Sequence, residues 1–587
     1  MRALLLALVL TAASGAAYAQ GAEPGSLEPV QEVPADVRAD DLASPDPSVE
    51  TELPGVTDDH GDADHGAAGA HAADGDHGDG HGDGHGPSPP IWLVIPFVVL
   101  LLMIATGPLF YAHHWHHHYP KYAVGLGVIV AAFYLFVLHS GTPILHAAEE
   151  YFAFIALLGS LYVASGTILI KTDFAGTPKA NSALLLVGAV LSNFIGTTGA
   201  SMLLIRPFMR LNAGRIRPYH IIFFIFIVSN VGGALTPIGD PPLFLGFLRG
   251  VPFFWTVAHI WYIWLPTILL LTAVFYVIDG RNKQESIREV AEDFGIDVHP
   301  GQIPGQPAVP EAAGIRDVEG IHDDEVEVDL GKKDGRFEIA IEGKSGFAWL
   351  AVIIAAVFID PKVIPALKDT VLDLHHFGVP FGIREVIMGA VAFLAYRFAS
   401  KEILRGNDFN FEPIKEVGFL FIGIFLTMQP ALTLIGEWAT SNADSIGVST
   451  FYFGTGVLSG VLDNAPTYVS FLSAAMGKFG MDVNLVTDVT AFAAAPGDPS
   501  GFYLQAISVA AVFWGAMTYI GNGPNFMVKA IAESSGVDCP SFGGYVLRYS
   551  LPILVPIYIL VWLVFFSGFV LPHPPDAAHQ ALMQMVP

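Results

Sequence analysis

Two stretches far apart in the chain have nearly the same sequence, GALTPIGDPP at residues 233–242 and GAMTYIGNGP at residues 515–524. Six of the ten positions are identical, Leu235 and Met517 form a conservative pair, and Asp240 of the first stretch stands opposite Asn522 of the second. Glycine and proline interrupt the helical hydrogen-bond ladder and free backbone groups that lipid cannot satisfy. Paired interruptions of this kind, one in each half of a membrane protein, point to a transport site. The alternative is two ordinary proline kinks in structural helices, which would not explain so long a match.

The composition around these stretches indicates a membrane protein. Of the 587 residues, 52% are hydrophobic and only 14% are charged, whereas about a quarter of the residues are charged in a typical soluble domain. The apolar residues are grouped in many runs close to the roughly 20 residues that cross a bilayer. The formal net charge of −27 is concentrated in the N-terminal part and in one loop. The single cysteine, Cys539, excludes intrachain disulfides and any cysteine-built metal site.

Twelve apolar segments are predicted, of which ten cross the membrane and two are re-entrant hairpins. The hairpins are assigned to 182–205 and 450–476, because Asn, Thr, Ser, Gly and Pro residues suit a plain lipid-facing helix poorly. The ten crossings are predicted at about 91–111, 121–140, 151–170, 219–248, 255–278, 346–360, 383–400, 416–436, 503–529 and 549–571.

The distribution of basic residues sets the orientation, because Lys and Arg are retained on the cytoplasmic side. With the N-terminal tail outside, most of the 28 Lys and Arg residues fall on the inner side. Lys179 precedes the first hairpin and Arg206 follows it, so that hairpin opens to the cytoplasm, whereas the loop 437–449 before the second hairpin carries no basic residue. Each half has five crossings, so the halves are inverted. The predicted fold is an all-α polytopic membrane protein of two inverted repeats of five transmembrane helices, each with one re-entrant hairpin and one broken helix.

The N-terminal residues resemble a secretory signal, with Arg2, an apolar stretch and an Ala17-Tyr18-Ala19 cleavage site. An uncleaved first anchor is the alternative reading of the same residues. We therefore expect a multi-pass protein of the bacterial inner membrane with a periplasmic N-terminal tail. The predicted domains are a signal peptide (1–19), a disordered periplasmic Asp/His-rich tail (20–90), transmembrane repeat 1 (91–278), a cytoplasmic linker loop (279–345), the inverted transmembrane repeat 2 (346–571) and a periplasmic C-terminal tail (572–587).

The two hairpins match each other more weakly than the two interruptions do. Residues 192–198, SNFIGTT, align with residues 463–467, DNAPT, so that Ser192 stands opposite Asp463 and Asn193 opposite Asn464. With these residues and the two interruptions, the chain resembles the NhaD-type sodium/proton antiporters, within the ion-transporter superfamily that includes citrate and dicarboxylate carriers (CitMHS-like) and the arsenite pump. The resemblance covers roughly residues 91–571. It implies a mobile transport domain of paired hairpins and broken helices, a separate scaffold, and a homodimer with elevator-type movement.

Two kinds of cargo fit these motifs, and the first is Na⁺ or Li⁺ exchanged for H⁺. A hard cation needs several oxygen ligands, and a proton-coupled exchanger needs a carboxylate for which the two cations compete. We expect Asp463 to be the alternating ligand and proton carrier, with Asp240 second; the alternative role of either residue is a helix cap. Further oxygen ligands are expected from Asn193, Thr197, Thr198, Thr236, Asn464, Thr467, Thr518, Asn522 and Asn525.

The second kind of cargo is an organic anion, citrate or a dicarboxylate, coupled to Na⁺ or H⁺. An anion site favours a nearby cation, and Lys529 and Arg206 are the candidates, although both lie at inner ends where basic residues are expected anyway. Two intramembrane aspartates and no central arginine favour cation exchange. We expect no enzyme, because motifs such as His-Glu-x-x-His are absent from the sequence. We also expect no bound cofactor, no nucleic-acid partner, and lipid, small ions and a second copy of the chain as partners.

Histidines form two further groups. Neutral imidazoles interleaved with aspartates can chelate transition metals, which makes a metal site in the tail conceivable, although a solvated low-complexity segment explains the same pattern. The candidate ligands are His60, His65, His71, His77, His81 and His85. The second group, His113 to His118, lies in the predicted connection 112–121, where pH sensing and interfacial anchoring are both open. Arg384 beside Glu385 predicts a local ion pair at a helix start.

Overall fold

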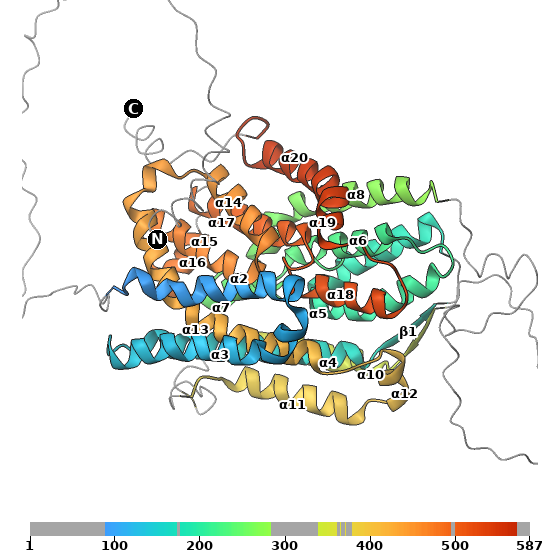
Figure 1. Ribbon diagram of the computed structural model, residues 1–587, viewed down its shortest axis with the longest axis horizontal. Helices are drawn as coiled ribbons and strands as arrows, with labels where there is room; N and C mark the ends of the chain where they lie inside the picture. Colours follow the sequence, from blue (N-terminus) through green and yellow to red (C-terminus); the bar gives the residue numbers. More distant parts are fainter. Residues whose placement is uncertain are drawn as a thin grey trace, which may run out of the picture. The chain divides into compact units, whose positions relative to one another are not determined.

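The computed structural model describes residues 88–172, 176–282, 339–360, 364, 370, 379–494 and 499–571. These residues are almost entirely helical (Figure 1). Within these described ranges, eight helical segments are long and apolar enough to cross a bilayer, which makes the chain a multi-pass helical membrane protein. They are His113–Phe136, Thr142–Gly166, Pro178–Leu211, Pro218–Leu235, Trp255–Asp279, Glu412–Ser441, Ser500–Met517 and Phe542–Phe565.

The predicted apolar segments coincide with helices, but several helices begin or end at other residues than predicted. In the first half the helices are α2 (Ile95–Phe110), α3 (Ala112–Phe136), α4 (Thr142–Gly166), α5 (Pro178–Leu211), α6 (Pro218–Ile227), α7 (Pro241–Arg249) and α8 (Trp255–Asp279). In the second half they are α10 (Ser345–Val357), α11 (Ile383–Phe398), α12 (Lys401–Gly406), α13 (Glu412–Ser441), α14 (Val448–Val461), α15 (Asn464–Lys478), α16 (Val486–Ala494), α17 (Pro499–Trp514), α18 (Gly523–Ser534), α19 (Phe542–Tyr545) and α20 (Val555–Phe565).

Three predicted connections contain helices instead. The connection 112–121 is not a loop, because α3 begins at Ala112 and contains the whole histidine group His113–His118. The segment before residue 151 is likewise the first part of α4, where Glu150 pairs with the buried Arg249 at 2.9 Å. Polar residues end an apolar run but do not end a helix, since the helix continues into the interface where water and lipid headgroups solvate its side chains. Similarly, α16 lies in a stretch predicted as loop.

The end of the predicted linker contains a strand that was not expected. Residues Ile339–Glu342 form β2, which pairs antiparallel with β1, Leu169–Thr172, directly after α4. Lys171 forms an ion pair with Glu342 across this pair at 2.6 Å. The linker residues 283–338 and the predicted signal, tail and C-terminal segments at 1–87 and 572–587 lie outside the described residues.

The long helix α5 folds back on itself. Gly196 has φ +76° and ψ 156°, which is non-helical, and only glycine adopts such a backbone at little cost. Asn181 at the start of α5 donates a hydrogen bond to Asn212 just after its end, 2.7 Å away. In a straight helix two residues so separated would be about 46 Å apart. The two limbs of α5, before and after Gly196, therefore form a helical hairpin.

A second helical hairpin joins α14 to α15 through Leu462 and Asp463. Its limbs approach closely where Gly454 faces the ring of Phe471, since a Cβ at Gly454 would lie 2.9 Å from that ring. Next to these hairpins, α13 runs along both α3 and α15 (Figure 1). Gly423 of α13 lies directly against the backbone of Ala123 in α3, which allows the close approach of these two helices.

The two repeated sequence stretches have the same backbone conformation. After α6, a short 3₁₀ turn at Val231–Leu235 leads to an extended Thr236, and α7 begins after Asp240 at φ −143° and ψ 143°. After α17, a 3₁₀ turn at Gly515–Met517 leads to an extended Thr518, and α18 begins after Asn522 at φ −155° and ψ 141°. Both predicted helix interruptions are confirmed.

Candidate functional site

The tips of both hairpins meet the two helix interruptions through equivalent backbone contacts. Thr197 N–H, at the start of the second limb of α5, donates to the Gly239 carbonyl at 2.8 Å. Asn464 N–H, at the start of α15, donates to the Gly521 carbonyl at 3.2 Å. Gly239 and Gly521 occupy matching positions in the repeated stretches, so the same joint is built twice.

This geometry corrects the alignment of the hairpins. Since Thr197 is equivalent to Asn464, Gly196 is equivalent to Asp463 and Ser192 to Ser459. Ser192 and Ser459 make similar contacts, with their hydroxyls donating to the carbonyls of Val228 and Ala511 at 2.7 and 2.6 Å, and these acceptors differ by one position in the match of the repeats. The predicted pairing of Ser192 with Asp463 was displaced by four residues, because the tips share no identical run long enough to fix the register.

Asp240 lies at the centre of the joints and is 1% exposed. Its Oδ1 accepts hydrogen bonds from the Thr197 hydroxyl at 2.8 Å and from Asn522 Nδ2 at 2.8 Å. Its Oδ2 accepts a hydrogen bond from Asn464 Nδ2 at 2.7 Å. One carboxylate thus binds the first hairpin, the second hairpin and the second interruption. Four of the predicted site residues, Thr197, Asp240, Asn464 and Asn522, come together here.

Asp463 precedes α15 and caps it, because its Oδ1 accepts the Ala465 N–H at 3.0 Å. This is the alternative role considered for it, yet only one of its two carboxylate oxygens is used in this way among the described contacts. Thr467 donates its hydroxyl to the Asp463 carbonyl at 2.8 Å. The neighbouring Asn464 Oδ1 is buried and accepts no hydrogen bond within the described part of the chain. Oxygen atoms with spare lone pairs therefore remain next to Asp240.

Neither aspartate forms an ion pair with Lys, Arg or His among the described residues. The positive electrostatic potential at the site comes from the N-terminal ends of helices instead. Helices α7, α15, α18 and the second limb of α5 all begin here, and each N-terminus carries the equivalent of about half a positive charge. Neutral donors and helix dipoles are therefore the described partners of the two carboxylates, and no side-chain cation within the described ranges neutralises them.

A small cavity of about 20 Å³ adjoins Asp240. It is lined by Thr197, Thr198 and Asp240 and, from α4, by Leu157, Leu161 and Tyr162, among others. This volume is comparable with the space that one buried water occupies. Thr198, another predicted ligand, is thus placed at the cavity without being one of the contacts of Asp240.

The other predicted oxygen ligands satisfy backbone groups that the interruptions leave free. Asn193 Nδ2 donates to the Gly232 carbonyl at 2.7 Å, and Asn193 Oδ1 accepts the Leu235 N–H at 2.8 Å. The hydroxyls of Thr236 and Thr518 accept the N–H groups of Gly239 and Gly521 at 3.1 and 3.2 Å. These contacts hold the broken backbone in place and do not reach Asp240.

Asn525 belongs to the same group and reveals a residue that sequence reasoning missed. Its Nδ2 donates to the carbonyls of Gly515 and Thr518, both at 2.9 Å. Its Oδ1 accepts a hydrogen bond from Asn230 Nδ2 at 2.6 Å. Asn230 lies just before the first interruption and is 0% exposed. An asparagine directly preceding a Val-Gly-Gly break was the available signal.

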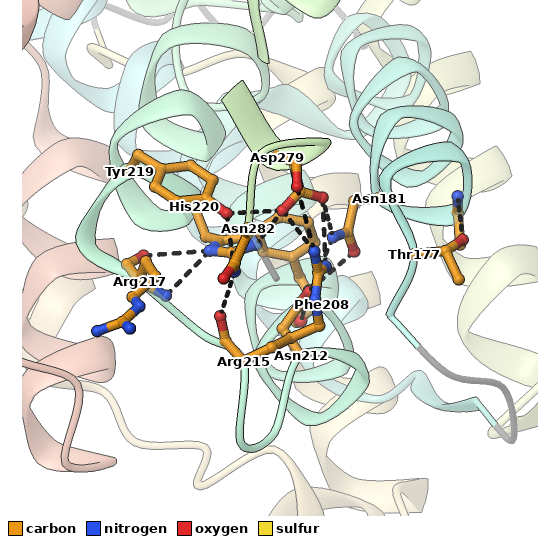
Figure 2. A network of polar contacts seen from close by, with 11 residues as sticks. Thr177, Asn181, Phe208, Asn212, Arg215, Arg217, Tyr219, His220, Asp279 and Asn282 are labelled. Carbon is orange, nitrogen blue, oxygen red and sulfur yellow. Dashed lines mark hydrogen bonds and ion pairs between the residues drawn. The ribbon is translucent and has the colours of Figure 1, made fainter. Parts of the chain in front are cut away.

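A second buried carboxylate, Asp279, joins a different network (Figure 2). Its Oδ1 lies 2.8 Å from Arg215 Nη2 and accepts the Tyr219 hydroxyl at 2.6 Å, and His220 Nε2 lies 3.1 Å away. Asn181 Nδ2 donates to Asp279 Oδ2 at 2.8 Å. The network joins the open end of the α5 hairpin to the start of α6 and the end of α8, as Figure 2 shows.

No group of three or more His, Cys, Asp or Glu residues suited to a metal ion occurs within the described ranges. The predicted tail ligands His60 to His85 lie outside them. In α3, the imidazoles of His114 and His118 stack with ring centroids 4.4 Å apart. The predicted pair of Arg384 with Glu385 is confirmed at 2.6 Å, and Arg384 also pairs with Asp360 at 2.7 Å.

The fold and site define a multi-pass membrane protein in which interrupted helices surround a buried carboxylate, an arrangement typical of secondary transporters. The family model CitMHS_2, described as "Putative citrate transport", matches residues 87–566. The chain therefore belongs to this transporter family, which agrees with the expectation that it is not an enzyme. A search of curated proteins gives no match.

Proposed function

We propose that the protein is a secondary active exchanger of Na⁺ or Li⁺ for H⁺ that works by alternating access. The observation that carries this proposal is the buried carboxylate of Asp240, held by three neutral donors and by no cationic side chain in the described structure. A buried charge without a partner is costly. A bound cation or a bound proton relieves that cost, so the two species compete for the same place.

Asp463 is the better candidate for the group that exchanges. Asp240 already receives donors on both oxygens, whereas the described contacts of Asp463 use only its Oδ1. The free lone pairs of Asp463 and Asn464 Oδ1 offer the oxygen ligands that a hard cation requires. In this mechanism Asp463 binds the cation on one side of the membrane and a proton on the other. Asp240 holds the two hairpins and the second interruption together during the transition.

The proposed architecture is two inverted repeats with re-entrant hairpins. It is supported by the equivalent Thr197–Gly239 and Asn464–Gly521 joints and by the matching conformations at Asp240 and Asn522. It is also supported by the charge distribution, which opens the first hairpin to the cytoplasm and the second to the periplasm. We further propose a homodimer in a bacterial inner membrane, with the N-terminal tail in the periplasm.

The second candidate function is coupled transport of citrate or another organic anion. The family description favours it, and so do the four helix N-termini, which suit an anion. Two carboxylates at the same place oppose it, because they repel a polyanion. Lys529, the proposed cation for such a site, is engaged with Glu533 at 2.6 Å.

Proton flux in inverted membrane vesicles tests the choice between these functions. We expect Na⁺ or Li⁺, but not K⁺ or citrate, to dissipate an imposed proton gradient. Asp463→Asn should abolish the response, Asp240→Asn should reduce it strongly, and the exposed Asp444→Asn should leave it unchanged as a matched control. A response to citrate without any response to Na⁺ or Li⁺ would establish the second function instead. Full activity of both Asp463→Asn and Asp240→Asn would remove the proposed proton carriers.

A further inference from the structure

The two helix interruptions are linked by side-chain amides that can be oriented in only one way. Asn525 Nδ2 faces the carbonyls of Gly515 and Thr518 at 2.9 Å. A carbonyl only accepts hydrogen bonds, so the NH₂ group must point toward these two and Oδ1 must point toward Asn230. The orientation of the Asn525 amide is therefore fixed by the broken backbone of its own segment.

The same reasoning fixes the next amide. Asn230 Nδ2 donates to the Ile225 carbonyl at 2.8 Å and to Asn525 Oδ1 at 2.6 Å. Both partners are acceptors, so the Oδ1 of Asn230 must point the other way, where Asn522 Nδ2 lies 3.3 Å from it. The Ser229 carbonyl lies 3.2 Å from the same Asn522 nitrogen. Together these two acceptors hold the NH₂ group of Asn522 toward them.

The orientation of the Asn522 amide in turn determines which of its atoms faces Asp240. One N–H of Asn522 is shared by Asn230 Oδ1 and the Ser229 carbonyl, so the other N–H, and not the amide oxygen, faces Asp240 Oδ1 at 2.8 Å. If the Asn522 amide rotated by half a turn, its oxygen would face the carboxylate, which is repulsive unless a cation lies between them. Asn230, together with the Ser229 carbonyl, thus favours the orientation in which Asn522 stabilises the charge of Asp240.

This relay of oriented amides, from Asn525 through Asn230 to Asn522, occurs once, although the fold is repeated. Extending the match of the repeated stretches places Asn230 opposite Val512 and Asn525 opposite Leu243. Both counterparts are apolar and buried, so the second half cannot form the reciprocal link. The asymmetry is the same as that of the carboxylates, since the first interruption carries Asp240 and the second carries the neutral Asn522.

We propose that Asn230 is a positioning residue that sets the affinity of the transport site through the orientation of Asn522. The inference rests on the proposed function only in taking the surroundings of Asp240 as the transport site. Asn230 does not contact Asp240, and none of the sequence motifs singled it out. Substitution of Asn230 should therefore change the apparent KM for the cargo. It should leave Vmax per folded protein nearly unchanged, because the residue does not contact the cargo site directly.

The test uses substitutions that the chain itself offers at equivalent positions. Asn230→Val introduces the residue found at the matching position 512, and Asn525→Leu introduces the residue found at 243. Leu243 and Asn525 both lie in the first turn of a helix, α7 and α18. Asn442→Val, at a partly exposed asparagine outside the site, is the control. Each variant is assayed in inverted vesicles with whichever of Na⁺, Li⁺ or citrate the wild type carries, and Vmax is divided by the amount of folded protein.

We expect Asn230→Val to raise the apparent KM roughly tenfold, the size of one lost hydrogen bond to a charged group, with a much smaller change in Vmax. Asn525→Leu should have the same direction and Asn442→Val no effect. In an Asn522→Ala background, Asn230→Val should have no further effect, because the relay acts through Asn522. Additive effects of the two substitutions, or an unchanged KM with only less folded protein, would overturn the proposal. Absence of Na⁺ and Li⁺ exchange in the wild type is a separate result that counts only against the proposed cargo.

Discussion

Asp240 and Asp279 are both buried carboxylates, 1% and 0% exposed, yet their partners differ in kind. Asp279 is paired with the Arg215 guanidinium at 2.8 Å and also contacts Tyr219 and Asn181. Among the described residues, Asp240 receives hydrogen bonds from one hydroxyl and two amides and from no charged side chain. The charge of Asp279 is thus neutralised permanently within the protein, whereas that of Asp240 is stabilised by dipoles alone.

The difference shows which carboxylate can take part in ion exchange. A carboxylate that is paired with an arginine binds a cation weakly, because the cation would have to displace the arginine from a buried ion pair. The Asp279 network therefore serves the fold, since it closes the open end of the α5 hairpin. A carboxylate surrounded by neutral donors can accept a proton or a metal ion without breaking an ion pair. This property places Asp240, with its neighbour Asp463, in the transport site.

The largest effect on stability is expected at Asp279. Asp279→Asn breaks the buried ion pair with Arg215 by removing its carboxylate, which should destabilise the protein by about 3–5 kcal/mol. Detergent-solubilised protein heated before size-exclusion chromatography should lose its folded peak at a clearly lower temperature than the wild type. The double variant Arg215→Met with Asp279→Leu removes both charges and should recover much of the loss. A single variant as stable as the wild type would mean that Asp279 is not a structural ion pair.

A smaller effect is expected from the backbone beside Asp240. A Cβ at Gly239 would lie 2.0 Å from the Gly233 carbonyl oxygen, so Gly239→Ala must displace the interruption that carries Asp240. We expect a destabilisation of about 1–3 kcal/mol together with loss of transport. Gly523→Ala is the matched control, because its Cβ would meet nothing within 4 Å. Equal activity of the two alanine variants would show that the close approach of Gly233 and Gly239 is dispensable.

Asp240→Asn sharpens the comparison, because it should separate folding from transport. The new amide retains an acceptor for two of the three donors and introduces no buried charge, so the loss of stability should be about 1–2 kcal/mol. The heated-protein assay should therefore show Asp240→Asn closer to the wild type than Asp279→Asn, while its ion flux is much lower. The reverse order of the two variants would exchange the roles assigned to the two carboxylates.

The smallest effect is expected at Lys529, the cation considered for an anion site. Its ion pair with Glu533 is partly exposed and spaced by one helical turn, and such pairs contribute about 0.3–0.5 kcal/mol. Lys529→Gln should change the apparent KM for the transported ion less than about twofold. A large rise in KM that is specific to citrate would restore the second candidate function.

The sequence was sufficient to locate the interruptions and both hairpins, because glycine and proline within apolar runs leave a strong signal. It did not reveal that Thr197, Asn464 and Asn522 would converge on Asp240, since the Asp240–Asn464 contact joins residues that are 224 positions apart. The pairing of β1 with β2 is likewise a long-range contact without a local pattern. Asn230 was missed for a related reason, because its role depends on Asn525, and no local motif specifies an amide orientation. The starts of α3 and α4 were misplaced because hydropathy marks the bilayer and not the helix.

Release of protons on cation binding is the most direct test of the central claim that a cation and a proton compete for one carboxylate. Purified protein in weakly buffered detergent solution is mixed with NaCl or LiCl, and the pH change is compared with that given by choline chloride. We predict that the wild type releases protons as it binds Na⁺ or Li⁺ and that Asp463→Asn releases none. Cation binding without proton release, or undiminished release by Asp463→Asn, would contradict the account.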